Sequence, residues 1–540
     1  MRGGHGRREN QTMKASSAKN SYDAIVVGAG HNGLTAAATL AKRGKRVLVL
    51  ERSQSIGGMA KTSEIAPGVR GPRMAHLLYN LSPLVSSELD LEAHGLRIVA
   101  RDLPTVSLSP DGRHVVIAGA EARYCDGGAH PDAETFSSLW QRMIRFSALI
   151  APIFARTPPR LAGGGMSRQN LFEGAQLAKL GLDLRRMGKS EMREFLRVVF
   201  SNVSDLFLDE IPDGPLAGAM AADAVLGAWA GPKSPGTVLM LMYRLAQGGA
   251  KQLPAGGMGA VTDALANAAR ARGAEIRTGV GVDSVLIDGE RVGGVAFGRN
   301  ESAEAPLVFS SLDTMSTLKL VGAEHFDIEA CRRIQNIRAK GTAAKINFAL
   351  SAVPKFHGLD DTLLRARLLV APSVNYIERA FNPAKYGELP SEPMIEAVIP
   401  SLSDPSLCDD DAHVMSAIVQ FAPYDLKGGW SSAARERLAK ISLALLEQYA
   451  PGIADLVTAT EVLSPADIER ETGARGGHWH HAEMAVDQMI MLRPTNGMGR
   501  YASGVPGLYF CGASAHPGGD VTGAAGRNAA LQSIRDGGAL

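Results

Sequence analysis

The feature that most constrains this chain is a glycine-rich turn between two segments of opposite character. Residues 22–28 read YDAIVVG, which is typical of a buried parallel strand. Residues 32–43 read NGLTAAATLAKR and predict a helix that ends before Gly44. Residues 46–51 (RVLVLE) predict a second buried strand. Together they predict a β-α-β unit, and therefore an α/β protein with a parallel sheet.

The turn itself, residues 28–33, matches the G-x-G-x-x-G pattern. Gly28 permits the tight turn, Gly30 lets backbone approach a pyrophosphate, and Gly33 lets the helix pack on the strand. The helix N-terminus, at Asn32, offers free N–H groups to phosphate oxygens. Glu51 follows Gly33 by 18 residues and ends the second strand, where an acid binds ribose hydroxyls and repels a 2′-phosphate. The pattern predicts a dinucleotide site and disfavours NADP.

A second glycine pair, in Gly57-Gly58-Met59-Ala60, follows the acid directly. A dinucleotide that ends in nicotinamide has no need of it. A longer cofactor, which runs from adenine to an isoalloxazine ring, needs the protein backbone to lie close along its flavin half. This segment therefore favours FAD over NAD. An ordinary surface turn at residues 57–58 is the alternative.

Glycine is abundant elsewhere too, at 60 of 540 residues or about 11%, against an average of about 7%. Further clusters lie at residues 254–259, 476–477 and 512–526. We expect the glycines at 28–33, 57–58, 256–259 and 512–526 to lie along one extended cofactor. Those at 163–165 and 473–477 are expected to form a linker and a turn on the substrate side. The helix that starts near Gly523 offers a second N-terminus, suited to the negative charge of a reduced flavin.

In motif order the chain resembles the phytoene-desaturase-like flavoproteins of the glutathione-reductase-type superfamily. Its more specific motifs look like those of the branch named for pyridine nucleotide-disulphide oxidoreductase domain-containing protein 2. The motifs are the start at 26–60, the glycine stretch at 254–259, the pattern GG-x-x-x-H-x-E-x-x-x-D-Q at 476–488, and CGAS-x-HPGG at 511–519. The resemblance spans most of residues 22–540, although the helical middle matches only in general character.

The resemblance implies an α/β fold with two domains. A discontinuous, glutathione-reductase-type Rossmann domain for FAD comes from residues 21–100, 250–322 and 500–540. An α+β substrate domain, with helices over a mixed sheet, comes from residues 101–249 and 323–499. The polar and basic residues 1–20 are expected to form a disordered tail.

The resemblance also implies which residues contact FAD. The first glycines hold the pyrophosphate, Glu51 and Arg52 the adenosine ribose, and the backbone of Val282 the adenine. The later residues lie towards the flavin. The full set is Gly28, Gly30, Asn32, Gly33, Glu51, Arg52, Gly57, Gly58, Met59, Ala60, Val282, Gly512, Asp520, Val521, Thr522 and Gly523.

Three residues are candidates for catalysis: His481, Asp520 and Glu483. Where the family ending commonly reads HPGGG, this chain has Asp520, a carboxylate near the flavin that tunes its potential, orients a polar group or acts as a base. A solvated loop carboxylate is the alternative. His481 matches the family pattern, whereas His478 and His480 are particular to this chain. We expect no metal site there, because a strand sends alternate side chains to opposite faces.

The expected function is that of an FAD-dependent oxidoreductase. It desaturates or oxidises a largely apolar, lipophilic substrate by hydride transfer to flavin N5, with oxygen or a quinone as acceptor. Two alternatives stay open: a redox-neutral isomerase or saturase on the same scaffold, and a non-enzymatic binding protein like the Rab GDP-dissociation inhibitors. The four cysteines form no CxxC or CxxxxC pair, which excludes disulphide exchange.

Composition limits the partners and the location. Lys and Arg number 57 against 55 Asp and Glu, so no strong field attracts nucleic acid. The longest apolar run, residues 214–231, is interrupted by Asp223 and predicts a buried helix. Further helices are predicted at 136–155, 170–187, 190–208 and 237–246. We expect a cytoplasmic protein whose apolar helices form core, line a tunnel or make peripheral contact with a membrane.

Overall fold

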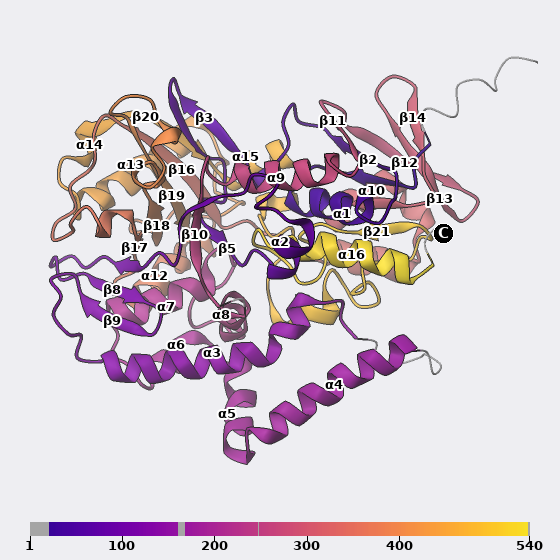
Figure 1. Cartoon of the computed structure of the whole chain (residues 1–540). Helices are drawn as coiled ribbons and strands as arrows, with labels where there is room; N and C mark the ends of the chain where they lie inside the picture. Colours follow the sequence, from indigo (N-terminus) through magenta and orange to yellow (C-terminus); the bar gives the residue numbers. More distant parts are fainter. Residues whose placement is uncertain (1–20, 160–167, 247, 538–540) are drawn as a thin grey trace, which may run out of the picture.

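The computed structural model describes residues 21–159, 168–246 and 248–537. The expected tail at residues 1–20 and the expected linker at residues 163–165 lie outside this range. The described chain forms two parts that lie side by side in Figure 1, each built around a sheet and its own hydrophobic core.

The first part contains a five-stranded sheet in which every neighbouring pair is parallel. Its strands come from three distant segments of the chain, in the spatial order β11 (Glu275–Thr278), β2 (Val47–Glu51), β1 (Ala24–Val27), β15 (Val308–Ser310) and β21 (Leu508–Phe510). The helix α1 (His31–Ala41) follows β1 and packs against α9 (Gly259–Arg270) and α16 (Ala524–Arg535). The predicted β-α-β unit is therefore confirmed.

A small antiparallel sheet extends this first part. It consists of β12 (Val282–Asp288), β13 (Arg291–Phe297) and β14 (Glu301–Glu304), and a tight turn at Gly289-Glu290 joins the first two strands. The helices α10 (Thr314–Val321) and α11 (Ile328–Gln335) follow β15 and lead into the second part.

The second part contains an eight-stranded mixed sheet. All neighbours are antiparallel except β7 and β17. The order is β20 (Val457–Leu463), β16 (Ala343–Leu350), β19 (His413–Gln420), β18 (Ile395–Val398), β17 (Arg367–Val370), β7 (Thr105–Ser107), β8 (Val115–Ala118) and β9 (Glu121–Tyr124). The helices that share its core are α3 (Ala133–Ala155), α5 (Lys189–Val199), α6 (Val203–Leu208), α7 (Pro215–Val225), α8 (Thr237–Leu245), α12 (Val374–Ala384) and α13 (Ser432–Glu447).

Short elements complete the fold. A three-stranded sheet of β5 (Leu78–Tyr79), β10 (Lys251–Pro254) and β6 (Ile98–Ala100) and a hairpin of β3 (Thr62–Ala66) and β4 (Val69–Pro72) carry the chain between the two parts. The remaining α-helices are α2 (Pro83–Leu89), α4 (Arg168–Arg186), which projects from the body in Figure 1, α14 (Ile453–Leu456) and α15 (Pro465–Thr472).

Two helix predictions have different outcomes. The single helix predicted over 190–208 is wrong: α5 ends at Val199, and α6 starts after Asn202, whose side chain accepts a hydrogen bond from the backbone N–H of Asp205. The buried helix predicted within 214–231 is confirmed as α7. A Cβ at Gly218 of this helix would lie less than 3.0 Å from the carbonyl oxygen of Ala371, so the helix packs tightly on the chain that follows β17.

Candidate active site

The glycine-rich turn after β1 leads directly into α1. Gly28 has a φ of +92°, which side chains rarely adopt, and a Cβ at Gly33 would lie less than 3.0 Å from the carbonyl oxygen of Gly28. A Cβ at Gly30, in contrast, would meet no atom within 4 Å. Two of the three glycines are therefore required by the protein's own backbone, and Gly30 leaves open space at the N-terminus of α1.

Glu51 ends β2 at the same edge of the sheet. Its Oε2 accepts a hydrogen bond from the backbone N–H of Ala29 at 2.8 Å, and its Oε1 accepts one from Ser53 at 2.8 Å. Both oxygens are thereby held beside the glycine-rich turn and keep lone pairs for further donors. The neighbouring Arg52 donates to the backbone oxygen of Glu471 at 3.2 Å.

A cavity of about 400 Å³, here called the groove, runs along the carboxyl ends of β1 and β2. A second cavity of about 90 Å³, the inner cavity, adjoins it. The expected cofactor-binding residues that line the groove are Gly28, Gly30, Asn32, Gly33, Glu51, Arg52, Gly58, Met59 and Val282. Those that line the inner cavity are Met59, Ala60, Asp520 and Val521.

The remaining four of these residues, Gly57, Gly512, Thr522 and Gly523, line neither cavity. They shape the backbone around both. The Gly57 N–H donates to the carbonyl oxygen of Ala29 at 2.9 Å, and a Cβ at Gly512 would lie less than 3.0 Å from the oxygen of Ser311. Residues 522–523 precede α16, which begins at Ala524.

The glycines at 256–259 also lie apart from the two cavities, although we expected them along the cofactor. The backbone N–H of Gly259 donates to Oγ1 of Thr62 at 3.0 Å. A Cβ at Gly257 would lie less than 3.0 Å from the same side chain. These glycines let the start of α9 pack against β3, which follows the wall formed by residues 58–60.

Several buried polar atoms beside the groove have no hydrogen-bond partner within the described chain. They are Nε2 of His31, both amide atoms of Asn32 and Nδ1 of His481. Buried polar groups are normally paired, so these atoms favour a polar ligand in the groove. The unpaired donors, the open space over Gly30 and the N-terminus of α1 together fit a dinucleotide.

The groove opens into the inner cavity. His31, Met59, Met74, Trp479 and Ala513 line both spaces. The other walls of the inner cavity are partly apolar and partly polar. The polar side chains are His76, Tyr79, Arg244, Glu396, His480 and Asp520.

Strands β17 and β18 place an ionic network beside the inner cavity. Arg367 Nε donates to Oε2 of Glu396 at 2.5 Å, and its Nη2 lies 2.7 Å from Oδ1 of Asp223. His76 Nε2 lies 2.8 Å from the other oxygen of Glu396. Burial acts to raise the pKa of Glu396, but Arg367 and His76 hold it below its usual value. Burial lowers the pKa of His76 to about 4, which favours the neutral imidazole at pH 7.

Lys345 on β16 is an unpaired amine next to this network. The residue is fully buried, and its Nζ has no hydrogen-bond partner in the described chain. Its cross-strand neighbours Ile418 and Leu463 line the inner cavity and the groove, respectively. Burial holds the pKa of Lys345 well below its usual value, although Glu396 and Glu461 oppose the shift. This favours the neutral amine.

Asp520 lies on the wall of the inner cavity with a φ of +63°. Asp tolerates this left-handed conformation better than most residues do. The backbone therefore accepts an aspartate at a position where the family that the chain resembles commonly has glycine. Asn80 Nδ2 donates to Oδ2 of Asp520 at 3.1 Å, and Nη2 of Arg244 lies 4.0 Å from Oδ1. Burial raises the pKa of Asp520, and these two neighbours oppose the rise only in part.

The three histidines do not lie on a strand, so that assumption is wrong. They follow the 3-10 turn Arg475–Gly477 in irregular chain, with His481 on the groove and His480 on the inner cavity. Trp479 Nε1 donates to Nε2 of His480 at 2.9 Å. Burial lowers the pKa of His481 to about 4, which leaves it neutral and weakly basic at pH 7.

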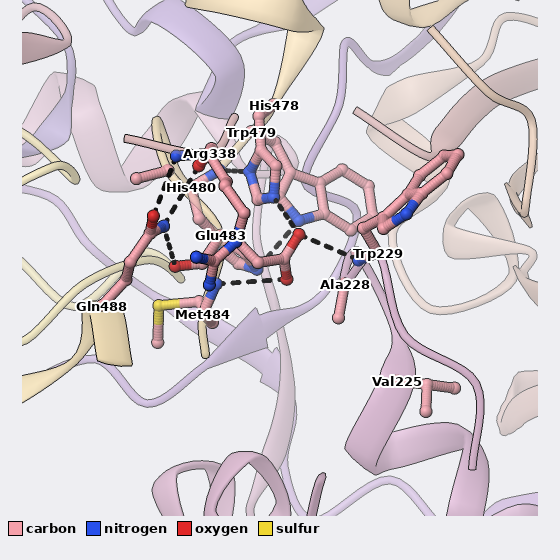
Figure 2. A network of polar contacts seen from close by, with 12 residues as sticks. Val225, Ala228, Trp229, Arg338, His478, Trp479, His480, Glu483, Met484 and Gln488 are labelled. Carbon is pink, nitrogen blue, oxygen red and sulfur yellow. Dashed lines mark hydrogen bonds and ion pairs between the residues drawn. The ribbon is translucent and has the colours of Figure 1, made fainter. Parts of the chain in front are cut away.

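Glu483 belongs to a different environment (Figure 2). Its Oε2 accepts the backbone N–H of Trp229 at 3.0 Å and lies 3.4 Å from His478 Nε2, and its Oε1 accepts the N–H of Met484 at 3.2 Å. It lines a third cavity, of about 550 Å³, together with Trp229 and Arg338. The structure thus brings His481 and Asp520 to adjoining cavities and leaves Glu483 apart from both.

The sequence analysis missed several residues of the inner cavity: His76, Tyr79, Arg244, Glu396 and Trp479. One of them carried a signal. Arg244 is the single charged side chain in α8, TVLMLMYRL, and a lone cation in a buried apolar helix requires a reason. Trp479 lies within the pattern at 476–488, at a position that the pattern leaves unspecified, and the other three come from short segments without a recognisable pattern.

The four cysteines of the sequence all lie within the described residues. Cys125, Cys331, Cys408 and Cys511 are free, and burial raises the pKa of the Cys511 thiol. Within residues 21–159, 168–246 and 248–537, no three His, Cys, Asp or Glu side chains are grouped to hold a metal ion. None of the helices in these ranges is long and apolar enough to cross a bilayer.

Comparison with known proteins gives matches over most of the chain. Residues 26–87 match the model of an NAD(P)-binding Rossmann-like domain. Pyridine nucleotide-disulfide oxidoreductase domain-containing protein 2 of Rattus norvegicus is 34% identical, over 96% of this chain and 94% of that protein. The phytoene desaturase (neurosporene-forming) of Rhodobacter capsulatus is 26% identical over 49% of this chain and 50% of its own. A solved oxidoreductase from Methanosarcina mazei shares the fold, with a TM-score of 0.59, 18% identity, and 95% and 99% coverage.

Proposed function

Because the chain belongs to the family of pyridine nucleotide-disulfide oxidoreductase domain-containing protein 2, we propose that it is an FAD-dependent oxidoreductase. Its substrate is largely apolar and is dehydrogenated by hydride transfer to flavin N5, and oxygen or a quinone takes up the electrons. The disulfide in the family name finds no support in the four free cysteines.

One observation carries the assignment of FAD: the groove does not end at the ribose-binding acid. From Glu51 and Val282 it continues past Gly58 and Met59 and opens into the inner cavity. FAD, which carries a ribityl chain and a three-ring isoalloxazine beyond the pyrophosphate, would use this continuation, whereas the shorter nicotinamide half of NAD does not need it. The unpaired atoms of His31 and Asn32 lie between the two ends.

The residues that would hold FAD follow from this path. The turn at residues 28–33 and the N-terminus of α1 would bind the pyrophosphate, because free backbone N–H groups and open space meet there. Glu51 would accept hydroxyl groups of the ribose. Met59, Ala60 and Val521 would lie near the flavin ring.

FAD supplies the two-electron acceptor of the reaction when it is bound. The chain itself supplies apolar walls and a proton acceptor on the inner cavity. Leu77, Leu226 and Ile418 give the inner cavity its apolar surface. They exclude water from the reacting carbon and suit a lipophilic body.

Asp520 is the best-placed proton acceptor of the three candidates. It lines the inner cavity, and burial moves its pKa upwards, towards the working pH of a general base. His481 is second, since its pKa of about 4 makes it a weak base on the neighbouring groove. Glu483 is third, because it lines neither space and already accepts two backbone N–H groups.

The absorption spectrum of the purified protein tests the proposal directly. A flavin band, FAD released on heating, and bleaching of that band by substrate without oxygen would support the dehydrogenase. A flavin that stays oxidised during turnover would point to the isomerase alternative. Protein that neither carries nor binds FAD would overturn the enzyme assignment and favour a binding role.

A further inference from the structure

One cation on the wall of the inner cavity lacks a close anionic partner in the described chain. Arg244 is only 6% exposed, and its Nη1 has no hydrogen-bond partner there. Its Nη2 donates to the backbone oxygen of Leu226 at a long 3.4 Å. A buried guanidinium with unused donors is unfavourable, so this arrangement calls for a ligand.

The acids near Arg244 do not fill this need. Glu396 and Asp223 both contact Arg367 at 2.7 Å or less. Asp520 is the nearest remaining carboxylate, and its 4.0 Å distance from Nη2 exceeds that of a hydrogen bond. Arg367 therefore takes up two carboxylates, whereas Arg244 has none within hydrogen-bonding distance.

The orientation of Arg244 is nevertheless fixed. Its guanidinium carbon lies 5.1 Å from the ring centroid of Tyr79, a cation–π contact. Tyr79 in turn donates its hydroxyl to Oε2 of Glu396 at 3.1 Å, which holds the ring in place. The unused nitrogen thus belongs to a side chain that is positioned before any ligand arrives.

The rest of the inner cavity has a different chemistry. Leu77, Leu226, Ile418 and Val521 present apolar surface, and Met59 and Met74 connect this surface to the groove. A ligand that fits both parts has one anionic end and an apolar body.

We propose that Arg244 binds the carboxylate of the substrate, and that the substrate is a carboxylic acid with an aliphatic or aromatic body. This inference rests on the proposed flavoenzyme function and narrows its substrate class. A carboxylate matches the planar donors of a guanidinium better than a hydroxyl or an amine does. Asp520, when ionised, would oppose binding because it places a like charge beside the same guanidinium.

Benzoate is a suitable probe because it joins a carboxylate to a small apolar ring. We would titrate it into the flavin-loaded protein, follow the flavin absorption band, and confirm the affinity by calorimetry. Benzamide, which has the same shape without the charge, is the matched ligand. We expect benzoate to bind at least tenfold more tightly than benzamide, and equal affinities would overturn the proposal.

Two variants then assign the site. Arg244→Met should weaken benzoate binding at least tenfold. Arg435→Met is the control and should leave benzoate binding unchanged. It removes an ion pair with Asp467, and neither of these two residues lines any of the cavities described above. If Arg244→Met lost FAD but kept its affinity for benzoate, Arg244 would be a cofactor contact and the proposal would fail.

Asp520→Asn is an independent test, because it predicts a gain and does not depend on how well the Arg244 variant folds. Asn tolerates a φ of +63° and keeps the shape of Asp without its charge. We expect benzoate to bind about tenfold more tightly to this variant. Unchanged or weaker binding would contradict the proposed site. Absence of FAD from the wild type would instead overturn the proposed function. Calorimetry with benzoate does not need the flavin signal, so failure of the Arg244 site and failure of the flavoenzyme function can be told apart.

Discussion

A Cβ at residue 33 would lie less than 3.0 Å from the carbonyl oxygen of Gly28, so the end of β1 and the start of α1 touch through backbone alone. Neither backbone can move away without shifting the sheet. We expect Gly33→Ala to lower the free energy of unfolding by about 1–3 kcal/mol and to reduce bound FAD. Chemical denaturation and the FAD content per chain measure both effects. An unchanged denaturation midpoint would show that the contact is not this tight.

Gly30→Ala provides the matched comparison. Gly30 has ordinary extended angles, φ −72° and ψ 169°, and its new methyl group would meet no protein atom within 4 Å. The FAD-free variant should therefore unfold like the FAD-free wild type. Its methyl group would stand where we place the pyrophosphate, so FAD affinity should fall at least tenfold. Normal FAD affinity in this variant would mean that the pyrophosphate does not pass over Gly30.

Glu51→Gln tests the ribose contact. The glutamine has no negative charge to accept the ribose hydroxyl groups. Its amide nitrogen, which is a donor, would also face the backbone N–H of either Ala29 or Ser53, which now donates to Glu51. We expect FAD affinity to fall about tenfold, or about 1.4 kcal/mol, which is typical of a hydrogen bond to a charged group. Fluorescence titration of FAD-free protein measures it. Glu290→Gln, at the exposed turn between β12 and β13, is the control and should bind FAD normally.

Lys345 predicts a dependence of stability on pH. Its folded pKa is lowered well below the unfolded value of about 10.4, so between these two values the unfolded chain binds one more proton than the folded chain. This group therefore destabilises the protein at neutral pH, and its cost shrinks by up to about 1.4 kcal/mol per pH unit as the pH rises towards 10.

Lys345→Met keeps the volume and removes the titration. We expect the variant to be more stable than the wild type at pH 7, with the difference shrinking towards pH 10. Urea denaturation across this range measures the difference. A constant difference would show that the amine is protonated in the folded state.

Asp520 predicts a pH profile for turnover. A base must be deprotonated, and burial raises its pKa, so kcat/KM should rise with pH through a value above the ordinary range of an aspartate. Asp520→Asn should lower kcat by about 10² to 10⁴-fold and flatten this acid limb. A variant that keeps both the rate and the limb would transfer the role of base to His481.

Much of the first part of the fold could be predicted from the sequence, because its signals are local. The turn at residues 28–33, its two flanking strands and Glu51 are each specified within a few neighbouring residues. The single helix over 190–208 and the strand assumed for the three histidines failed for two different reasons. Asn202 offers a side-chain cap that ends one helix and starts the next, and the chain after residue 475 follows a turn whose shape depends on distant contacts.

Met59, Ala60, Asp520 and Val521 of the inner cavity were expected from the sequence, but most of its polar side chains were not. His76, Arg244 and Glu396 come from a loop, a helix and a strand that meet only through tertiary packing. Their grouping depends on how the eight-stranded sheet and the helices over it pack, which no local pattern encodes. Arg244 alone among them has a local signal, because it is the lone charge of an apolar helix and a buried cation needs a partner.

The late arrival of β21 and α16 has a consequence for synthesis on the ribosome. Until residues 508–535 emerge, β15 is an open edge of the parallel sheet, because its neighbour β21 is missing. The helix α1 is also uncovered, because α16, which contacts it closely at Asn32 and Gly526, is missing too. An open edge of this kind pairs readily with other chains. The first part of the fold must therefore finish folding after most of the chain has been made, and we expect a nascent chain stalled before residue 508 to leave this edge exposed.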